Sequence, residues 1–207
     1  MSTSREAALA GIPLPDWGGE LELRTALATE QDTARGLFLT SVLDSVQALG
    51  DEAALKRCRE VLGTQQVVAF FNYPVILLMR LTAAAMRELS GRYGGPEEAL
   101  RMLGRKAAQD FVTSPVGNAV RVVAGKDIKQ FLSGVQTLYR MTASYGERTV
   151  TWQGPKAGRL TLRRTFLPPP YHEGVLLLML ERLGARNARV KGQQTAPLDS
   201  AYDFTWE

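Results

Sequence analysis

The amino-acid sequence predicts an α+β fold, in which an N-terminal helical half is followed by a β-β-α-β-β unit that forms an antiparallel sheet packed by helices. Apolar residues first recur about every 3.6 residues, as in amphipathic helices, and later alternate with polar residues, as in half-buried strands. The chain has 207 residues, 45% of them hydrophobic, which is enough for one domain. We therefore expect a partly flexible N-terminal arm at residues 1–30 and a single α+β domain at residues 31–207.

Glycine and proline mark the ends of the expected helices. The first helix ends at Gly50 and the second at Gly63, because glycine readily adopts the backbone conformation that closes a helix. Asp51 is placed to cap the second helix. Pro74 begins a third helix, which is apolar on most sides and should be buried, and Pro96 begins a fourth. Two shorter helices are expected near residues 115–124 and 127–138.

The strands are predicted from alternating apolar and polar residues. The segments "ERTVTW" and "RLTLRRTF" flank the turn "GPKAG" and are typical of a β-hairpin, with Val150 and Trp152 on one face. The segments "ARVKG" and "AYDFTW" supply two later strands. One face of an antiparallel sheet can contact water, so we expect helices on the other face.

The stretch "TFLPPPYHEGVLLLMLERLG" joins the hairpin to the later strands and contains the only histidine, His172. Its three prolines stop the strand, Gly174 permits close packing, and an apolar helix follows and ends at Gly184. We expect His172 to be exposed or hydrogen-bonded at the start of this helix. If the domain holds a ligand, this stretch forms one wall and His172 is a polar contact rather than a catalyst.

The sequence contains no recognisable set of catalytic or metal-binding residues. A hydrolytic triad would have to use His172, yet no nucleophile motif accompanies it. A zinc or iron site needs several His, Cys or carboxylate ligands at defined spacing. The single cysteine, Cys58, is expected to be a buried structural thiol. We therefore predict no enzymatic activity and no metal.

Aromatic residues near the expected helix–sheet junctions indicate a mostly apolar ligand pocket with few polar groups. The alternative is that these side chains simply belong to the core. The candidate pocket residues are Phe70, Phe71, Tyr73, Met79, Tyr139, Tyr171 and His172.

The net charge of +4 is unevenly distributed. Between Arg140 and Lys191 there are ten basic and three acidic side chains, a balance of +7. Such a region attracts anionic partners, among them nucleotides and nucleic acids. The alternative is a composition that is biased toward arginine. The candidate basic surface consists of Lys156, Arg159, Arg163, Arg164 and Arg189.

The sequence also bears on location. The first residues lack the basic start and apolar run of a signal peptide, and the apolar segments are too short to span a membrane. We therefore expect a cytoplasmic protein.

Several segments together resemble one family. "TARGLFLTSVLDSV", "FFNYPVILLMRL", "LYRMTASYGERTV", "LPPPYHEGVLLLMLERLG" and the ending "YDFTWE" are similar to a paralogous family of uncharacterised myxobacterial proteins. The similarity extends from Asp32 to Glu207 and is specific as a whole pattern. It implies no catalytic residues.

The C-terminal half also resembles the haem–nitric oxide binding domains and the related TRAPP vesicle-tethering and 4-vinyl reductase domains. These share helices, a hairpin, a glycine-containing apolar helix and two strands with an aromatic–x–aromatic ending, which correspond here to residues 149–166, 174–184 and 189–206. The resemblance implies an α+β fold that holds a haem, an acyl chain or another apolar ligand between helices and sheet, and that often forms dimers.

Haem itself is not expected. Haem–nitric oxide binding domains use a histidine on a helix before the hairpin and a Tyr-x-Ser-x-Arg motif on the strand before the glycine-containing helix. This chain has no histidine before the hairpin, and the matching strand reads "LTLRRTF". We predict a non-enzymatic regulatory or sensory adaptor domain that binds a small apolar ligand and forms a homodimer. The alternatives are a protein-interaction scaffold of the tethering type, and a binder of anionic nucleotide or nucleic acid through the basic C-terminal half.

Overall fold

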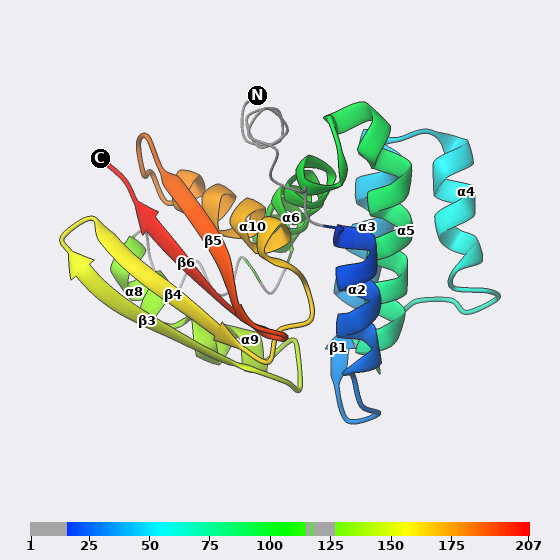
Figure 1. Cartoon of the computed structure of the whole chain (residues 1–207), viewed down its shortest axis with the longest axis horizontal. Coiled ribbons are helices and arrows are strands. Elements are labelled where there is room, and N and C mark those ends of the chain that lie inside the picture. Colours follow the sequence, from blue (N-terminus) through cyan, green and yellow to red (C-terminus); the bar gives the residue numbers. More distant parts are fainter. Residues whose placement is uncertain (1–15, 115–116, 118–126) are drawn as a thin grey trace.

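The computed structural model describes residues 16–114, 117 and 127–207 and has the predicted α+β class (Figure 1). The described helices are α2 (Trp17–Ala26), α3 (Gly36–Leu49), α4 (Glu52–Glu60), α5 (Val75–Tyr93), α6 (Pro96–Thr113), α8 (Ile128–Ser133), α9 (Val135–Arg140) and α10 (Pro169–Arg182). The described strands are β1 (Thr33–Arg35), β2 (Asn72–Pro74), β3 (Glu147–Gly154), β4 (Ala157–Arg163), β5 (Arg189–Ala196) and β6 (Asp199–Thr205).

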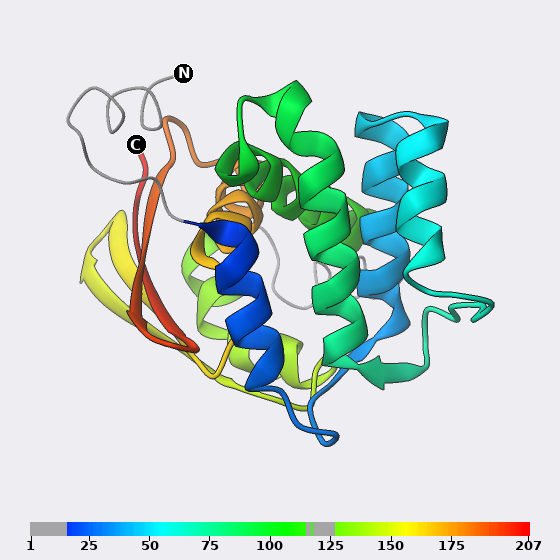
Figure 2. The ribbon, with the colours of Figure 1, turned by 45° about the vertical axis from the view of Figure 1, so that its right-hand side comes forward.

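Helices α6 and α10 lie between the sheet and helices α3 to α5 (Figure 2). The buried apolar residues form two groups. The helical cluster contains side chains from α3, α5 and α6, such as Leu39, Leu78 and Leu100. The sheet cluster contains side chains from β4, β6, α8 and α10, such as Leu162 and Phe204. The two clusters meet where α6 and α10 cross.

The main sheet has the strand order β3-β4-β6-β5, and all its neighbouring strands are antiparallel. The predicted hairpin of β3 and β4 is confirmed. On the inner face, Leu160 of β4 lies opposite Tyr202 of β6, and both are buried. On the outer face, Arg159 lies opposite Asp203 and pairs with it at 2.7 Å. One face is thus apolar and covered by helices, and the other is polar, as antiparallel sheets permit.

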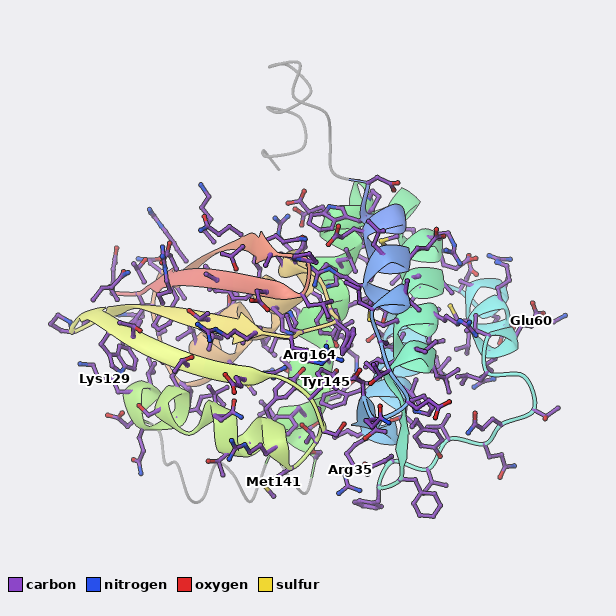
Figure 3. The ribbon with its side chains drawn as sticks, turned by 60° about the horizontal axis from the view of Figure 1, so that its bottom comes forward. Arg35, Glu60, Lys129, Met141, Tyr145 and Arg164 are labelled. Atoms are coloured by element: carbon purple, nitrogen blue, oxygen red, sulfur yellow. The ribbon has the colours of Figure 1, made fainter. Side chains whose placement is uncertain are left out.

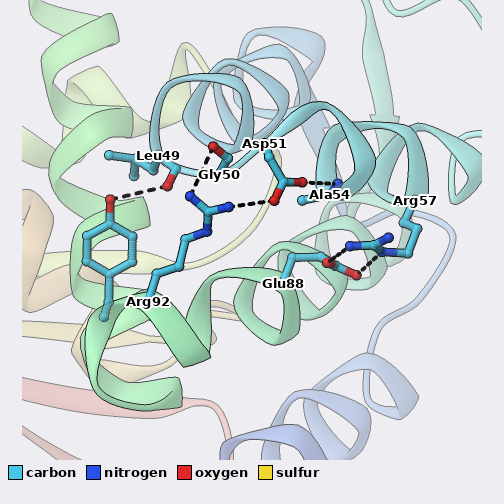
Figure 4. A network of polar contacts seen from close by, with 8 residues as sticks. Leu49, Gly50, Asp51, Ala54, Arg57, Glu88 and Arg92 are labelled. Carbon is cyan, nitrogen blue, oxygen red and sulfur yellow. Dashed lines mark hydrogen bonds and ion pairs between the residues drawn. The ribbon is translucent and has the colours of Figure 1, made fainter.

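A polar network fixes the turn between α3 and α4 against α5 (Figure 4). Asp51 accepts a hydrogen bond from the backbone N–H of Ala54 at 2.8 Å, which confirms the predicted cap of α4. Arg92 of α5 contacts the same carboxylate at 2.5 Å. Arg57 of α4 pairs with Glu88 of α5 through both carboxylate oxygens. Exposed ion pairs of this kind contribute little energy each, so they orient α4 more than they stabilise it.

The crossing of α6 and α10 depends on two glycines, each of which faces the backbone of the opposite helix. A Cβ atom at Gly104 would lie 1.9 Å from the carbonyl oxygen of Tyr171, and one at Gly174 would lie 2.1 Å from that of Arg101. Atoms cannot approach so closely, so neither helix could keep its position with a larger residue at these sites. The predicted role of Gly174 in close packing is confirmed.

Helix α2 lies within the segment that the sequence analysis expects to be an arm. Asp16 caps it by accepting two hydrogen bonds from backbone N–H groups of its first turn. Leu21 and Arg24 are fully buried. Arg24 donates a hydrogen bond at 3.0 Å to the carbonyl oxygen of Thr165, which is 141 residues away in the sequence. Hydrogen bonds from Arg24 to groups distant in sequence hold α2 in place. Local composition does not reveal such partners.

Other local expectations also differ from the structure. The single helix expected at residues 127–138 is two helices, α8 and α9, which Gly134 separates. The short antiparallel pair of β1 and β2 was not expected, since each strand has only three residues. The helix expected near residues 115–124 and the first half of the expected arm, residues 1–15, lie outside the described residues.

Arg164, just after β4, joins the sheet to the loop between α2 and β1, and Tyr145 lies near it (Figure 3). The Arg164 guanidinium contacts the carboxylate of Asp32 at 2.7 Å. Burial alone would raise the pKa of Asp32, but hydrogen bonds from Arg164 and Thr29 hold it below its ordinary value. Asp32 therefore stays ionised, and the ion pair persists at neutral pH.

We predict that Gly104→Ala destabilises the protein by about 1–3 kcal/mol, because the added methyl group forces α6 and α10 apart. Urea unfolding measures the free energy of unfolding. The matched control is Gly91→Ala on α5, where an added Cβ meets open space; it should be neutral or stabilising by up to about 1 kcal/mol. Equal effects at both sites would contradict the role assigned to the crossing.

Candidate ligand cavity

A cavity of about 140 Å³ lies where the helical and sheet clusters meet. Its wall combines Leu78 and Leu167 of the helical cluster with Leu160 and Leu162 of the sheet cluster. A single water needs only about 10–15 Å³ of such volume, so the cavity is much larger than one water molecule requires.

Helices α6, α8, α9 and α10 supply most of the apolar wall. The apolar side chains that these helices contribute are Ala107, Ala108, Phe111, Phe131, Leu132, Val135, Leu138, Val175, Leu176 and Met179. An apolar wall of this extent favours a ligand with an apolar body.

Arg148 brings a positive charge into the wall. It is the second residue of β3 and points to the same face as Val150 and Trp152, because alternate residues of a strand share a face. Only 4% of Arg148 is exposed. Its Cζ lies 3.3 Å from the ring centroid of Tyr139, and its Nη1 donates to the carbonyl oxygen of Tyr145 at 3.1 Å. Within the described part of the chain, its Nε and Nη2 have no hydrogen-bond partner.

His172 is the second nitrogen-bearing side chain in the wall. The rings of Tyr171 and Tyr202 flank it, each with its centroid 5.8 Å away. Burial, together with the charges of Arg148 and Arg24, lowers the pKa of His172 to about 3, so the imidazole is neutral at physiological pH. It is 8% exposed, and its Nδ1 has no partner among the described residues. His172 is thus buried rather than exposed, because the first turn of α10 lies beneath the sheet, and the backbone carbonyl groups of Pro168 and Leu167 interact with its ring, in line with the hydrogen-bonded alternative.

Tyrosine rings form the end of the cavity near Arg148. Tyr145 packs edge-on against Phe166, with ring centroids 4.9 Å apart, and against Tyr139 at 6.3 Å. Burial raises the pKa of Tyr145 and of Tyr171 well above the ordinary value, so both phenols stay neutral. Arg148 therefore supplies the charge at this end of the cavity.

The structure brings Tyr139, Tyr171 and His172 together in the cavity wall, but it places the other four candidate pocket residues elsewhere. Phe70 and Phe71 are 70% and 63% exposed, because they lie in the loop before β2 rather than at the start of α5. Tyr73 is buried, and its hydroxyl accepts a hydrogen bond from the backbone N–H of Val68. Met79 is fully buried in the helical cluster. Its position agrees with the alternative that such residues belong to the core.

The five candidate basic residues do not act as one free surface. Arg159 pairs with Asp203, and Arg164 pairs with Asp32. Lys156, Arg163 and Arg189 are exposed. Carboxylates within the chain therefore offset two of the five charges, which weakens the attraction of this face for anionic partners.

Sequence reasoning did not single out Arg148 or Tyr145. A signal for Arg148 was present, since it occupies the inward position of an alternating strand whose other inward residues are apolar. A charged residue at such a position is an exception that a ligand or a buried partner must explain. Tyr145 carries no such signal, because it precedes the strand. Cys58 is buried as expected, and burial raises the pKa of its thiol to about 11.

Across residues 16–114, 117 and 127–207, no cluster of three or more His, Cys, Asp or Glu side chains is arranged to hold a metal ion. No helix in the same part of the chain is long and apolar enough to cross a membrane.

Solved structures of H-NOX proteins are similar to this fold. One is an H-NOX protein from S. oneidensis in the Fe(II)NO ligation state, with a TM-score of 0.66, 11% identity and coverage of 84% of this chain and 99% of that one. The Fe(II) unliganded H-NOX protein from K. algicida has a TM-score of 0.61 and 11% identity, with coverage of 84% of this chain and 96% of that one. The expected similarity in fold to haem–nitric oxide binding domains is therefore confirmed.

An oxygen-binding H-NOX domain related to soluble guanylate cyclases, in its oxygen complex, gives a TM-score of 0.60 and 12% identity, with coverage of 84% and 95%. No curated protein matches the chain. A family model described as "Protein of unknown function (DUF2378)" matches residues 27–207. Because this match spans most of the sequence, the chain belongs to the DUF2378 family.

Proposed function

We propose that this chain is a non-enzymatic regulatory domain that holds a small apolar ligand between helices α6, α8, α9 and α10 and the sheet. The cavity of about 140 Å³ carries this proposal. Protein interiors are close-packed, and an empty void of this size destabilises a fold. A ligand that fills the void removes that penalty. Its binding would therefore stabilise the packing of α6 against α10.

The cavity volume limits the size of the ligand. An engineered cavity of about 150 Å³ in another protein binds benzene, whereas sites for drug-sized ligands span about 300–1,000 Å³. The cavity of this chain therefore suits a compact body of about the size of benzene.

The similar solved structures support ligand binding as a role of this fold. The S. oneidensis H-NOX protein holds an Fe(II)NO group, and the domain related to soluble guanylate cyclases binds oxygen. We extend to this chain the general idea of a small molecule held by an H-NOX-like fold. Homodimer formation, a protein partner and a cytoplasmic location stay predictions.

Haem is not the ligand that we propose. His172 offers a neutral imidazole in the cavity wall, which suits an iron ligand. However, haem is larger than a drug-sized ligand, and the cavity of about 140 Å³ is smaller than the sites that drug-sized ligands occupy. The described residues therefore do not fit a haem.

We predict that benzene raises the midpoint of thermal unfolding. At about ten times its Kd, the stabilisation is about 1.4 kcal/mol, which raises the midpoint by about 3–6 °C for a chain of this size. Ala108→Leu fills the cavity and should remove this shift. Ala53→Leu, an identical change at an exposed position of α4, should retain it. An unchanged midpoint in the wild type, or an equal shift in the Ala108 variant, would contradict the proposed cavity.

We also predict that the purified protein incubated with hemin forms no histidine-dependent haem complex, because the cavity is too small. The measurement is the visible absorption spectrum of the wild type and of His172→Ala after removal of free hemin. A sharp Soret band in the wild type that His172→Ala abolishes would contradict this prediction and identify His172 as an iron ligand.

The buried His172 should make stability depend on pH. The pKa of His172 is about 3 in the folded chain and 6.5 ordinarily, so the unfolded chain binds the proton first as pH falls. The stabilisation is complete above about pH 6.5 and declines below it, by up to about 1.4 kcal/mol per pH unit. Urea unfolding between about pH 6.5 and pH 5 should show this slope in the wild type and not in His172→Gln. Since the chain has one histidine, equal slopes would show that folding does not lower the pKa of His172.

A further inference from the structure

Arg148 is a buried cation that the chain leaves partly unsatisfied. It is 4% exposed and lines the cavity. Its Nη1 donates to a neutral acceptor, the carbonyl oxygen of Tyr145, and its face stacks on the ring of Tyr139. Within residues 16–114, 117 and 127–207, Nε and Nη2 have no partner. Burial of charged donors without an acceptor costs free energy. An acceptor supplied by a ligand would remove this cost.

A second buried arginine shows how this fold satisfies such a group on its own. Arg24 is fully buried, and its Nε binds the carboxylate of Glu20 at 2.7 Å. Its Nη1 donates to the carbonyl oxygen of Thr165 at 3.0 Å, and its Nη2 donates to the side chain of Gln194 at 2.9 Å. The chain therefore provides a carboxylate and further acceptors for Arg24, whereas Arg148 has a carbonyl and an aromatic face.

The two unpartnered nitrogens of Arg148 form the edge through which other arginines of this chain bind carboxylates. Arg159 binds Asp203 through Nε and Nη2, both at 2.7 Å. Arg164 binds Asp32 through the same two nitrogens, at 3.3 and 2.7 Å. The two donors of this edge are parallel and match the two oxygens of a carboxylate.

We propose that the Nε–Nη2 edge of Arg148 binds the carboxylate of an apolar acid whose body fills the cavity. This inference rests on the proposed function and deepens it by naming the ligand class. One carboxylate carries one negative charge and balances the one cation in the wall, whereas a phosphate dianion would leave an unbalanced buried charge. His172 is neutral and does not alter this balance. The apolar side chains of α8 and α10 then enclose the rest of the molecule.

The test compares two probes of nearly equal shape, benzoate and benzyl alcohol, by isothermal titration calorimetry at neutral pH with the full chain. We expect the wild type to bind benzoate at least about tenfold more tightly than benzyl alcohol, as a charged hydrogen-bonded pair permits. Arg148→Gln should abolish this preference while it still binds benzyl alcohol. Arg163→Gln, which removes an exposed charge from the other strand of the hairpin, should retain it.

Each remaining outcome overturns one of the two ideas. If the wild type binds both probes equally, or if Arg163→Gln loses the preference as Arg148→Gln does, the carboxylate site at Arg148 is wrong and the cavity stands. If neither probe nor benzene binds, the proposed function itself fails. Should Arg148→Gln not fold, Arg148→Lys keeps the charge without the planar edge. It should then lose most of the preference, and a retained preference would overturn the proposal.

Discussion

The close crossing of α6 and α10 is the constraint on which the rest of the structure depends. Gly104 and Gly174 let each helix touch the backbone of the other. Glu173 then binds Arg101 of α6 at 2.7 Å and the backbone N–H of Gly192 in β5 at 2.7 Å, so one side chain ties both helices to the sheet. With this spacing, α10 packs on α6 with one face and on the sheet with the other. A wider crossing would separate the helical and sheet clusters and change the shape of the cavity between them.

Two buried arginines differ in how many of their donors the described chain satisfies. Arg24 lies outside the cavity wall, has a carboxylate and several acceptors, and holds α2 against the C-terminal half. Arg148 lines the cavity and keeps two donors without a partner in the described chain. Proteins satisfy nearly all buried polar groups, and exceptions concentrate at functional sites. This contrast is the observation behind the proposed carboxylate site at the end of the cavity, where Tyr139 and Tyr145 lie against the guanidinium.

Much of the fold could be predicted because its signals are local. The cap at Asp51, the alternation on either side of "GPKAG" and the glycine at position 174 each act through neighbours or through a fixed periodicity. Features that depend on contacts between distant residues could not be predicted in this way. Helix α2 is stabilised by acceptors more than 140 residues away, as in the bond from Arg24 to Thr165. Strands β1 and β2 exist because they pair with each other, and three residues carry too weak a pattern to show it.

The sequence by itself determined the α+β class, the order of most elements and the side of the strand on which Arg148 lies, because periodicity and caps depend on residues close in the chain. Only the tertiary structure decided which aromatic residues share a cavity: Tyr139, Tyr171 and His172 meet there, while Phe70 and Phe71 face solvent. It also decided that Arg24 is satisfied and that two nitrogens of Arg148 are not. Satisfaction of a buried charge depends on groups that folding brings together from distant positions, and no local pattern encodes it.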